Sequence, residues 1–392
     1  MMAVLWADDG CIIARQHYLI EKYPMKSICF ITTGDIKDIA TAKRALGLAN
    51  PLSDLGWKVS IIMEDTEENR HRVGLECEER VQCFFLTYKS AWDEKRKKKN
   101  LLKKIKPDYV YLCAFVFRNI VHLRFKCKRL VEHSELQSSI KGVKWWRKCN
   151  FLWNEYYSLI YADGILNASR FLQQWYQKKA NCYFLRNKPM LYFPYAYNQK
   201  ICEIGVSPKP VDFSRNPNDI LVTYLGSLTQ GYSTMDIVKA VELLHHPEVK
   251  VLLIGKGGDS SDIEDYIRNH GLQQQVFLLG YVDEEEIPSY FSVTDVFILP
   301  MNDTVKDWAR CPSKLYMYLP YRKPIVTAKI GEPYEVLKDA GIYYQPGSIR
   351  SLTEALRKAI DVKSINIDAT CHEWSARASL LNAWIENSFE NK

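Results

Sequence analysis

The run Ile220-Leu221-Val222-Thr223-Tyr224-Leu225 decides the fold, because it is the first of a series that continues to residue 361. Comparable runs, short, continuous and rich in β-branched residues, lie at 249–254, 276–279, 296–299 and 324–327. Such runs are typical of parallel strands that are buried on both faces. Helical patterns alternate with them at 234–244, 261–269, 284–291, 313–319, 334–338 and 351–360. The alternation predicts an α/β domain with a parallel sheet, and such sheets bind ligands beyond the carboxyl ends of their strands.

The first half of the chain is also predicted to be α/β, although its pattern is less regular. Small and apolar residues recur at helical spacing from Ala42 to Leu55, and Gly56 ends this helix. Strands are expected at 25–32, 58–63, 82–86, 108–114, 129–132 and 164–167. Proline and serine cluster at 206–218, which indicates a hinge. We therefore expect an N-terminal extension, two similar domains and a C-terminal segment, at 1–24, 25–205, 206–370 and 371–392.

Composition places the chain among globular proteins. Its 392 residues are 47% hydrophobic and 12% aromatic, which allows two or three packed domains and excludes disordered and fibrous classes. The net charge of +7 suits an anionic ligand or a membrane surface and does not require nucleic acid. The eleven cysteines form no CxxC pair and no Cys/His ligand spacing, so neither a zinc site nor a disulfide framework is indicated.

The sequence also bears on where the protein resides. Its longest apolar runs have the length of a strand, far below the ~20 residues of a membrane-spanning helix. Residues 1–24 include Asp8, Asp9 and Arg15 and lack a sustained apolar core, which is unlike a secretory signal. With the scattered cysteines, this favours a cytoplasmic protein that is in solution or peripheral on a membrane.

Several motifs follow one another in the second half in a distinctive order. They are Tyr224-Leu225-Gly226-Ser227-Leu228, Val251-Leu252-Leu253-Ile254-Gly255, 276–282, 294–300, Pro312-Ser313-Lys314-Leu315 and Gly341-Ile342-Tyr343-Tyr344. With this series the chain resembles the retaining glycosyltransferases of the GT-B fold, family-four type, in which two Rossmann-like domains with parallel sheets face a cleft. The first half is similar through the loop at Gly34 and through 131–136 and 162–169. Glu373-Trp374-Ser375 and the helix after it resemble the family's C-terminal segment, which crosses back to the first domain.

The resemblance implies a reaction. A sugar would pass from a nucleotide-sugar donor to a glycan or lipid-linked acceptor with retention of configuration, in the assembly of surface polysaccharide or glycoconjugates. The donor is a substrate, and no cofactor or metal is implied. No DxD pair points to a catalytic metal either.

The turn Arg310-Cys311-Pro312-Ser313-Lys314 is the strongest candidate for the donor phosphates. Backbone N–H groups at a helix start and fixed cations stabilise the negative charge of a departing diphosphate, and Arg310, Ser313 and Lys314 supply both. The alternative is an ordinary surface helix start. Further donor-binding candidates, on the glycine turns and after a strand, are Gly226, Ser227, Gly255, Tyr281 and Val282. For Gly255 a flexible turn, and for Tyr281 a packed aromatic ring, are the competing interpretations.

The chain departs from the family pattern at two places. An Arg directly after the first glycine and a Lys a few residues later are replaced by Ser227 and by Gln230-Gly231-Tyr232. Two glutamates that flank the phosphate turn, eight positions apart, are replaced by Ala309 and Met317. Met317 is by default a core residue. Both departures bear on activity.

In the first half, His133 and Glu135 are the candidate catalytic residues. The imidazole would orient the donor sugar or stabilise charge at the transferred carbon, and Glu135, like Glu132, would bind hydroxyls. A hydrogen-bonded structural histidine is the alternative. Gly34 is the candidate on the acceptor side, and Glu284-Glu285-Glu286 is interpreted as the acidic first turn of a helix.

Residues 95–106 form a basic amphipathic pattern, and the aromatic stretches 144–147 and 151–153 lie nearby in sequence. They are either a solvated surface or a site that contacts anionic lipid. The sequence thus predicts a glycosyltransferase. The alternatives are a catalytically silent GT-B protein that binds glycan or a partner, and a sugar-nucleotide epimerase. A nucleic-acid-binding module is disfavoured because no recognition motif accompanies the basic residues.

Overall fold

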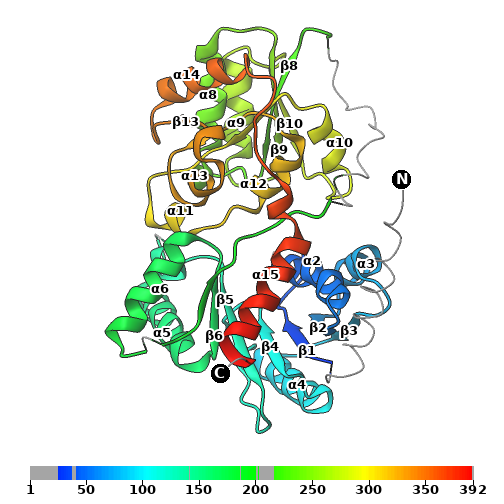
Figure 1. Cartoon of the computed structure of the whole chain (residues 1–392). Helices are drawn as coiled ribbons and strands as arrows, with labels where there is room; N and C mark the ends of the chain where they lie inside the picture. The colour runs from blue at the N-terminus through cyan, green and yellow to red at the C-terminus, as the bar shows by residue number, and fades with distance from the viewer. Residues whose placement is uncertain are drawn as a thin grey trace, which may run out of the picture.

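The computed structural model describes residues 25–37, 41–140, 142–185, 187–199, 202 and 216–390. The expected N-terminal extension at 1–24 and most of the expected hinge at 206–218 lie outside the described residues. Two α/β domains are stacked one above the other, and the last helix lies against the first domain (Figure 1).

The first domain is built on a parallel sheet in the order β3-β2-β1-β4-β5-β6-β7. Its strands are β1 (Ser27–Ile31), β2 (Lys58–Glu64), β3 (Gln82–Leu86), β4 (Tyr109–Leu112), β5 (Lys128–His133), β6 (Gly164–Asn167) and β7 (Met190–Tyr192). Its helices are α2 (Thr41–Asp54), α3 (Glu67–Glu76), α4 (Ala91–Ile105), η1 (Gln137–Ser139), α5 (Trp145–Tyr161) and α6 (Arg170–Cys182). All the strands expected from the sequence are confirmed, and β7 is an addition.

The second domain has a parallel sheet in the order β10-β9-β8-β11-β12-β13. Its strands are β8 (Ile220–Leu225), β9 (Val249–Ile254), β10 (Val276–Gly280), β11 (Val296–Leu299), β12 (Ile325–Ala328) and β13 (Ile342–Tyr344). Its helices are η2 (Gln230–Tyr232), α8 (Thr234–Leu244), α9 (Ser260–Asn269), α10 (Ile287–Ser292), α11 (Val305–Ala309), α12 (Ser313–Tyr318), η3 (Leu319–Tyr321), α13 (Gly331–Leu337), η4 (Lys338–Ala340) and α14 (Ile349–Ala359). The chain continues with η5 (Thr370–His372), α15 (Trp374–Ile385) and η6 (Glu386–Glu390).

Each sheet reverses its strand order beside its first strand. β1 lies between β2 and β4, and β8 lies between β9 and β11. Crevices for ligands form at such reversals, beyond the carboxyl ends of the strands. The loop at Gly34 follows β1 and the turn at Gly226 follows β8, so both candidate glycines lie at these two crevices.

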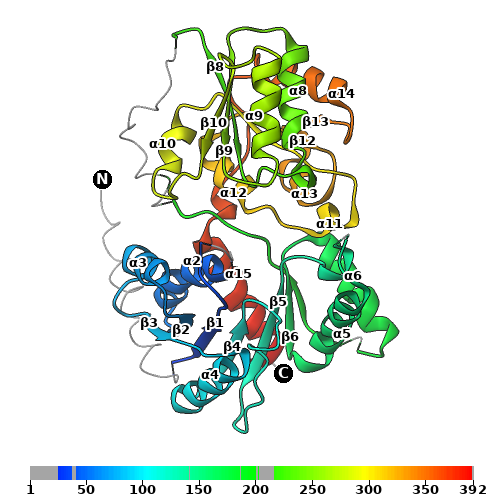
Figure 2. The same cartoon turned by 180° about the vertical axis from the view of Figure 1, so that it is seen from behind.

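Apolar clusters cover both faces of each sheet. In the first domain, one cluster includes α2 and α15 and the other includes α4, α5 and α6 (Figure 2). Trp374 of α15 packs on Gly47 of α2 so closely that a Cβ on Gly47 would lie 2.3 Å from the indole. The two Rossmann-like domains and the crossing helix expected from the sequence are therefore confirmed.

The two domains contact each other on two sides. On one side Ser169 donates a hydrogen bond to the carbonyl of Ala309 at 2.6 Å, and Tyr192 donates to the buried carboxyl of Glu332. Burial raises the pKa of Glu332 to about 7, against the hydrogen bonds that it accepts from tyrosines. These contacts join α6 and β7 to α11 and α13.

The second contact between the domains involves the acidic run 284–286, which was expected to form the first turn of a helix. Helix α10 begins at Ile287, so Glu284 and Glu285 precede it instead of forming its first turn. Glu284 pairs with Lys43 at 2.6 Å and with Arg72 at 2.9 Å, both in the first domain. Glu284 therefore forms ion pairs between the two domains. The sequence pattern did not predict this role.

The basic run in α4 also differs from expectation. Lys98 is buried, where it pairs with Glu94 at 2.6 Å and donates to Thr32 O and Asn119 Oδ1. Lys97 bonds to Thr87 O at 2.8 Å. Both lysines therefore fix the helix to the domain, and the buried Lys98 is not available to a membrane.

Candidate active site

A cavity of about 530 Å³ lies between the two domains. The residues named from the sequence that line it are Glu132, His133 and Glu135 in the first domain and Arg310, Ser313 and Lys314 in the second. Glu132 and His133 end β5 and Glu135 comes shortly after it, whereas the other three belong to the turn that begins α12. The fold therefore brings the candidate catalytic and phosphate-binding groups to one cavity from opposite domains.

Two glycines give Lys314 its place beside the second sheet. A Cβ on Gly226 would lie 1.9 Å from Lys314 Nζ, and a Cβ on Gly255 would lie 1.9 Å from the carbonyl oxygen of Gly226. The φ angles are +153° and +140°, which favour glycine. Only residues without a side chain allow Lys314, the β8 turn and the β9 turn to come this close.

The two cations of the turn differ in their pairing. Arg310 is held by Asp307, with Nε 2.7 Å from Oδ1. Lys314 has no ion pair among the described residues. Burial, together with the charge of Arg310, lowers the pKa of Lys314 to about 7. An anion beside Nζ would stabilise the protonated ammonium and so oppose both of these effects. Lys314 is therefore the better candidate for binding a phosphate.

Tyr232 and Lys306 belong to this cluster, and sequence reasoning missed their part in it. The Tyr232 ring lines the cavity and lies 4.7 Å from Lys306 Nζ, 4.7 Å from the Arg310 guanidinium and 5.1 Å from Lys314 Nζ. An aromatic face favours cations at these distances. The ring of Tyr232 thus contacts three cations. It lies in the stretch 227–232, where the resemblance described above would place an Arg and a Lys.

His133 is bonded inside the protein through both ring nitrogens. Ser158 donates its hydroxyl to Glu155 O at 2.7 Å, so it accepts from His133 Nε2 at 2.9 Å. Nδ1 then accepts from the Tyr176 hydroxyl at 3.1 Å, and the two rings stack. Burial lowers the pKa of His133 to about 3. The imidazole is therefore neutral. Its ring lines the cavity without bringing a charge to it.

Carboxylates occupy the first-domain wall. Desolvation by the surrounding protein raises the pKa of Glu135, although the charge of Lys306 opposes this shift. Glu132 is buried and pairs with Arg44 Nε at 2.6 Å, and it also accepts from Tyr111 and Ser134. Glu135 is thus the carboxylate that remains open to a substrate, while Glu132 fixes Arg44 at the cavity wall.

The other sequence candidates lie elsewhere. The cavity wall, as far as the chain is described, does not include Ser227, Tyr281, Val282 or Gly34. The exposed ring of Tyr281 lies between Lys37 of the first domain at 5.0 Å and Lys256 at 5.9 Å. Val282 packs against an apolar cluster of the second domain. Asn69 holds the Gly34 loop through the carbonyl of Gly34 at 3.2 Å.

Apolar side chains occupy positions 309 and 317, where the family pattern has glutamates. Ala309 is fully buried, with its carbonyl bonded to Ser169. Met317 packs against the apolar cluster that contains α12. Neither position offers a group to a ribose.

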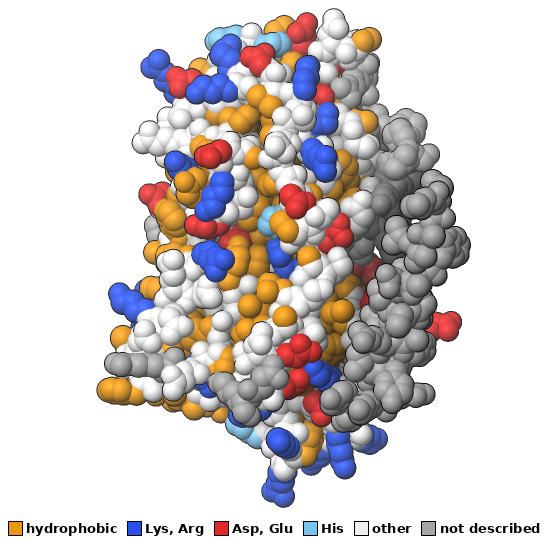
Figure 3. All heavy atoms as spheres, in the orientation of Figure 1, with side chains coloured by type: hydrophobic (Ala, Val, Ile, Leu, Met, Phe, Trp, Pro, Cys, Tyr) orange, Lys and Arg blue, Asp and Glu red, His pale blue; other side chains and the backbone are white. Residues whose placement is uncertain are grey.

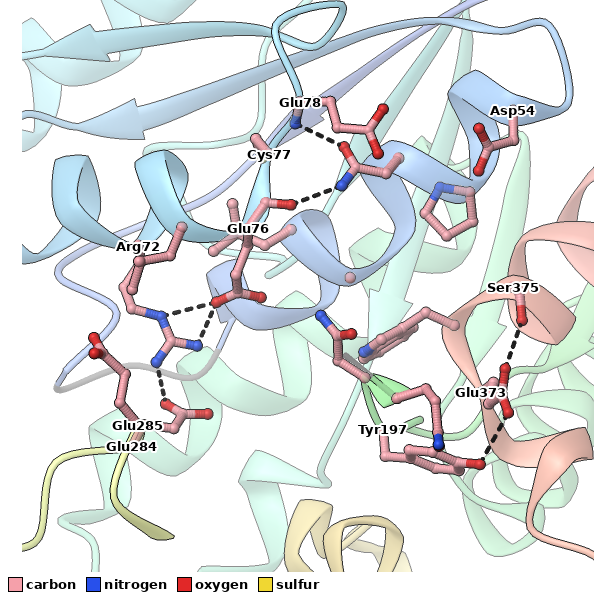
Figure 4. Close-up of a pocket in the computed structure, with 18 residues that line it drawn as sticks. Asp54, Arg72, Glu76, Cys77, Glu78, Tyr197, Glu284, Glu285, Glu373 and Ser375 are labelled. Atoms are coloured by element: carbon pink, nitrogen blue, oxygen red, sulfur yellow. Dashed lines mark hydrogen bonds and ion pairs between the residues drawn. The ribbon is translucent and has the colours of Figure 1, made fainter. Parts of the chain in front are cut away.

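A second cavity, of about 380 Å³, opens beside the interdomain ion pairs (Figure 4). It lies between α2, α3 and the start of α15, and it contains none of the residues singled out above as donor-binding or catalytic. Its carboxylates are already paired. Arg72 bonds to Glu76 and pairs with Glu284, and Glu373 accepts from Tyr197 and Ser375. Glu76, Glu284 and Glu373 are therefore engaged in contacts within the chain.

The described residues contain neither a metal-binding cluster nor a membrane-spanning helix. No group of three or more His, Cys, Asp or Glu side chains in the described part of the chain is placed to hold a metal ion. Within the same residues, no helix combines the length and apolar character needed to cross a bilayer.

Solved structures share this architecture. The glycosyltransferase of Rickettsia africae is similar with a TM-score of 0.64 and 13% identity, over 94% of this chain and 100% of that chain. Anabaena HepE in complex with UDP and glucose gives 0.63 and 14%, over 93% and 95%. The pneumococcal O-GlcNAc transferase GtfA in complex with UDP and GlcNAc gives 0.67 and 10%, over 94% and 100%. The chain therefore has the GT-B fold.

The family of the second domain follows from its sequence. Residues 209–379 match the family described as Glycosyl transferases group 1. This domain, with the start of α15, is a glycosyltransferase group 1 domain. The sequence has no significant match among curated proteins.

Proposed function

We propose that this protein transfers a sugar from a uridine-diphosphate sugar to a hydroxyl of a glycan or lipid-linked acceptor, with retention of configuration. The family match supports a transferase. The similar HepE and GtfA were solved with UDP together with glucose or GlcNAc, which supports the nucleotide. Assembly of polysaccharide or glycoconjugates, on the cytoplasmic side of a membrane, is the context that we propose.

The observation that carries the proposal is Lys314 in the interdomain cavity. Its ammonium has no carboxylate partner among the described residues and touches the Gly226 turn at the carboxyl end of β8. A diphosphate there would meet Lys314, Arg310 and the amide of Ser313. These groups stabilise the charge that develops on the diphosphate as the sugar bond breaks. Lys306 adds a cation close by.

Titration calorimetry with UDP tests the donor site. Lys314→Ala should weaken UDP binding by about 1–3 kcal/mol, or roughly ten- to a hundredfold, because a charge-assisted contact is lost. Lys358→Ala, on the exposed face of α14, is the matched control and should leave the affinity unchanged. Equal affinity of the Lys314→Ala and wild-type proteins would place the donor elsewhere.

The pKa of Lys314 gives a second test. In the free protein its pKa is about 7, and a bound diphosphate should raise it. UDP binding at pH 8 should therefore take up a proton, and the affinity should fall as the pH rises above about 7. Calorimetry in buffers of different ionisation enthalpy measures this uptake. Uptake that persists in the Lys314→Ala protein would assign the proton to another group.

Product analysis tests the reaction. Release of UDP from a bound UDP-sugar, with lipid-linked and oligosaccharide acceptors, should be followed by NMR of the product's anomeric centre. An inverted centre would contradict the retaining assignment. His133→Ala should lower the rate by about ten- to a thousandfold and change UDP affinity only a few-fold, because the ring forms a wall of the sugar's cavity.

A second candidate is a catalytically silent GT-B protein that binds a glycan or a partner. Two observations favour it, because Ala309 and Met317 offer no carboxylate and His133 uses both nitrogens internally. A silent protein would bind UDP and show no turnover with any donor and acceptor. Turnover that is lost in Lys314→Ala would reject it.

A further inference from the structure

We propose that the first domain carries a docking surface for an anionic lipid bilayer. The docking surface is formed by the exposed face of α5, the turn after α6, Trp92 of α4, and Phe117, whose ring contacts Trp92. The docking is independent of the proposed transfer reaction. Only the conclusion that the acceptor is lipid-linked rests on that function.

Helix α5 exposes a stripe of large apolar side chains. Trp145, Leu152, Trp153 and Ile160 are all exposed, and their spacings of seven and eight residues place them on one face of the helix. Trp145 is 78% exposed. Every residue from 144 to 150 is exposed, so the start of the helix projects from the domain. A contiguous apolar surface of this kind marks an interaction site.

The turn after α6 extends this stripe. Phe184 is 87% exposed and adopts a left-handed φ of 59°. That conformation is costly for a bulky residue, yet it holds the ring in solvent. The neighbouring Tyr183 packs edge-on against Tyr156 of α5, at 4.6 Å between ring centroids. In Figure 3 hydrophobic side chains gather at the lower left edge, the end of the first domain where α5 and α6 lie in Figure 1.

Aromatic contacts continue the docking surface towards α4. Trp153 is stacked with Tyr157, whose hydroxyl lies 3.4 Å from His122 Nε2. Burial and then the charge of Lys95 lower the pKa of His122, which places Lys95 nearby. The exposed rings of Trp92 and Phe117 meet edge-on at 4.6 Å, and Lys95 Nζ lies 4.1 Å from the Phe117 ring.

Charge selects an anionic occupant. The described residues between 142 and 188 include seven basic residues and only two acidic ones, Glu155 and Asp163. Both acids are engaged, because Glu155 accepts from Ser138 and Asp163 pairs with Arg129 at 2.9 Å. Two copies of this basic surface would repel each other. Tryptophan and tyrosine mixed with Lys and Arg are the side chains that favour the interface of an anionic bilayer.

The opposite face of α5 reaches the candidate active site. Asn154 and Glu155 line the interdomain cavity, and Ser158 holds His133. The docking surface and the cavity are therefore two sides of one helix, about 10 Å across. An acceptor could keep its lipid chain in the bilayer while its sugar headgroup enters the cavity.

Vesicle binding by the full chain tests the proposal. The protein should co-sediment with vesicles of phosphatidylcholine and phosphatidylglycerol, less so with phosphatidylcholine alone, and less with added salt. Leu152→Asp should reduce binding to the anionic vesicles by about tenfold or more, because it places a negative charge within the apolar stripe. Leu243→Asp on α8 is the matched control, since the two leucines are 46% and 49% exposed, and it should bind as the wild type does.

Charge and exchange provide further measurements. Arg147→Glu with Lys148→Glu should abolish the preference for anionic lipid, whereas Arg350→Glu with Lys358→Glu, on exposed α14, should keep it. In the unaltered protein, hydrogen exchange of residues 144–153 should slow when anionic vesicles are added. This readout does not depend on the folding of any variant.

Three results would overturn the proposal. They are equal binding to neutral and anionic vesicles, equal loss in the two leucine variants, and a dimer in solution that Leu152→Asp dissociates, which would make the surface an interface between copies. Vesicle binding is measured without donor. A protein that binds vesicles and transfers no sugar would therefore contradict the proposed function and leave the docking surface intact.

Discussion

The two domains share one architecture but bury different polar groups. The second domain buries mainly hydroxyls that bond to backbone, such as Thr294 to Tyr290 O at 2.8 Å and Thr327 to Leu299 O at 2.8 Å, together with the carboxylates of Asp307 and Glu332. The first domain buries the ion pairs of Arg44 with Glu132 and of Lys98 with Glu94, as well as His133. Loss of a hydroxyl that bonds to backbone costs one neutral hydrogen bond, whereas removal of one member of a buried ion pair leaves the other charge uncompensated. The first domain should therefore be the more sensitive to single polar substitutions.

Lys98→Ala should have the largest effect. It leaves the buried carboxylate of Glu94 without its closest cation, and breaking a buried pair costs about 3–5 kcal/mol. Lys103→Ala, on the exposed side of the same helix, should change stability by less than about 0.5 kcal/mol. Denaturant unfolding measures both. Similar small losses would show that α4 does not depend on its buried lysine.

Acid should destabilise the first domain through His133. The folded pKa of about 3 lies below the ordinary value of 6.5, so the unfolded chain takes up the proton first. The contribution of the neutral His133 to the free energy of unfolding is fully present above pH 6.5. It is lost as the pH falls towards 3, by up to about 3–5 kcal/mol. His133→Gln should flatten this part of the pH profile. An unchanged slope from pH 6.5 to 3 would mean that other groups set the acid sensitivity.

Gly255→Ala tests the close packing of the second domain. Its Cβ would meet the carbonyl of Gly226 at a positive φ, so we expect a loss of about 1–3 kcal/mol in stability and weaker UDP binding as the Gly226 turn moves. Gly258→Ala, in the same loop with no atom within 4 Å of its Cβ, should change either property little. Thermal unfolding with and without UDP compares the two. Equal behaviour would remove the steric argument.

The smallest effect is expected at the interface between the domains. Glu284→Gln removes the charge that pairs with Lys43 and Arg72, and partly exposed pairs contribute about 1 kcal/mol. Solution scattering should show a larger radius of gyration for this variant. Glu354→Gln on the surface of α14 is the control. A Glu284→Gln protein as compact as the wild type would show that the contacts of α6 with α11 and α13 suffice.

Sequence reasoning predicted the two sheets because their strands are continuous apolar runs, a pattern that survives without tertiary information. The strands that it missed, β7 and β13, are three-residue strands at the edges of the sheets, too short to show a period. It also placed Arg310, Ser313, Lys314, His133 and Glu135 around one cavity through their motifs. It did not find Tyr232 and Lys306, whose meeting depends on how η2 and α11 pack.

The charged residues were the least predictable from sequence. The basic run of α4 looked uniformly exposed, but Lys98 lies where the helix meets the domain and is buried with Glu94. The spacing of apolar residues along a helix does not show whether a given lysine is exposed or pairs with a buried carboxylate. The same limit applies to Glu284, whose cations stand in another domain.

The return of α15 to the first domain has a consequence for how the protein is made. Ala378, Leu381 and Ile385 belong to the same apolar cluster as strands β1 and β2, yet α15 follows every strand of both sheets in the order of synthesis. On the ribosome, therefore, the second domain completes its core before the first domain can. One apolar face of the nascent first domain therefore stays uncovered until α15 has been synthesised.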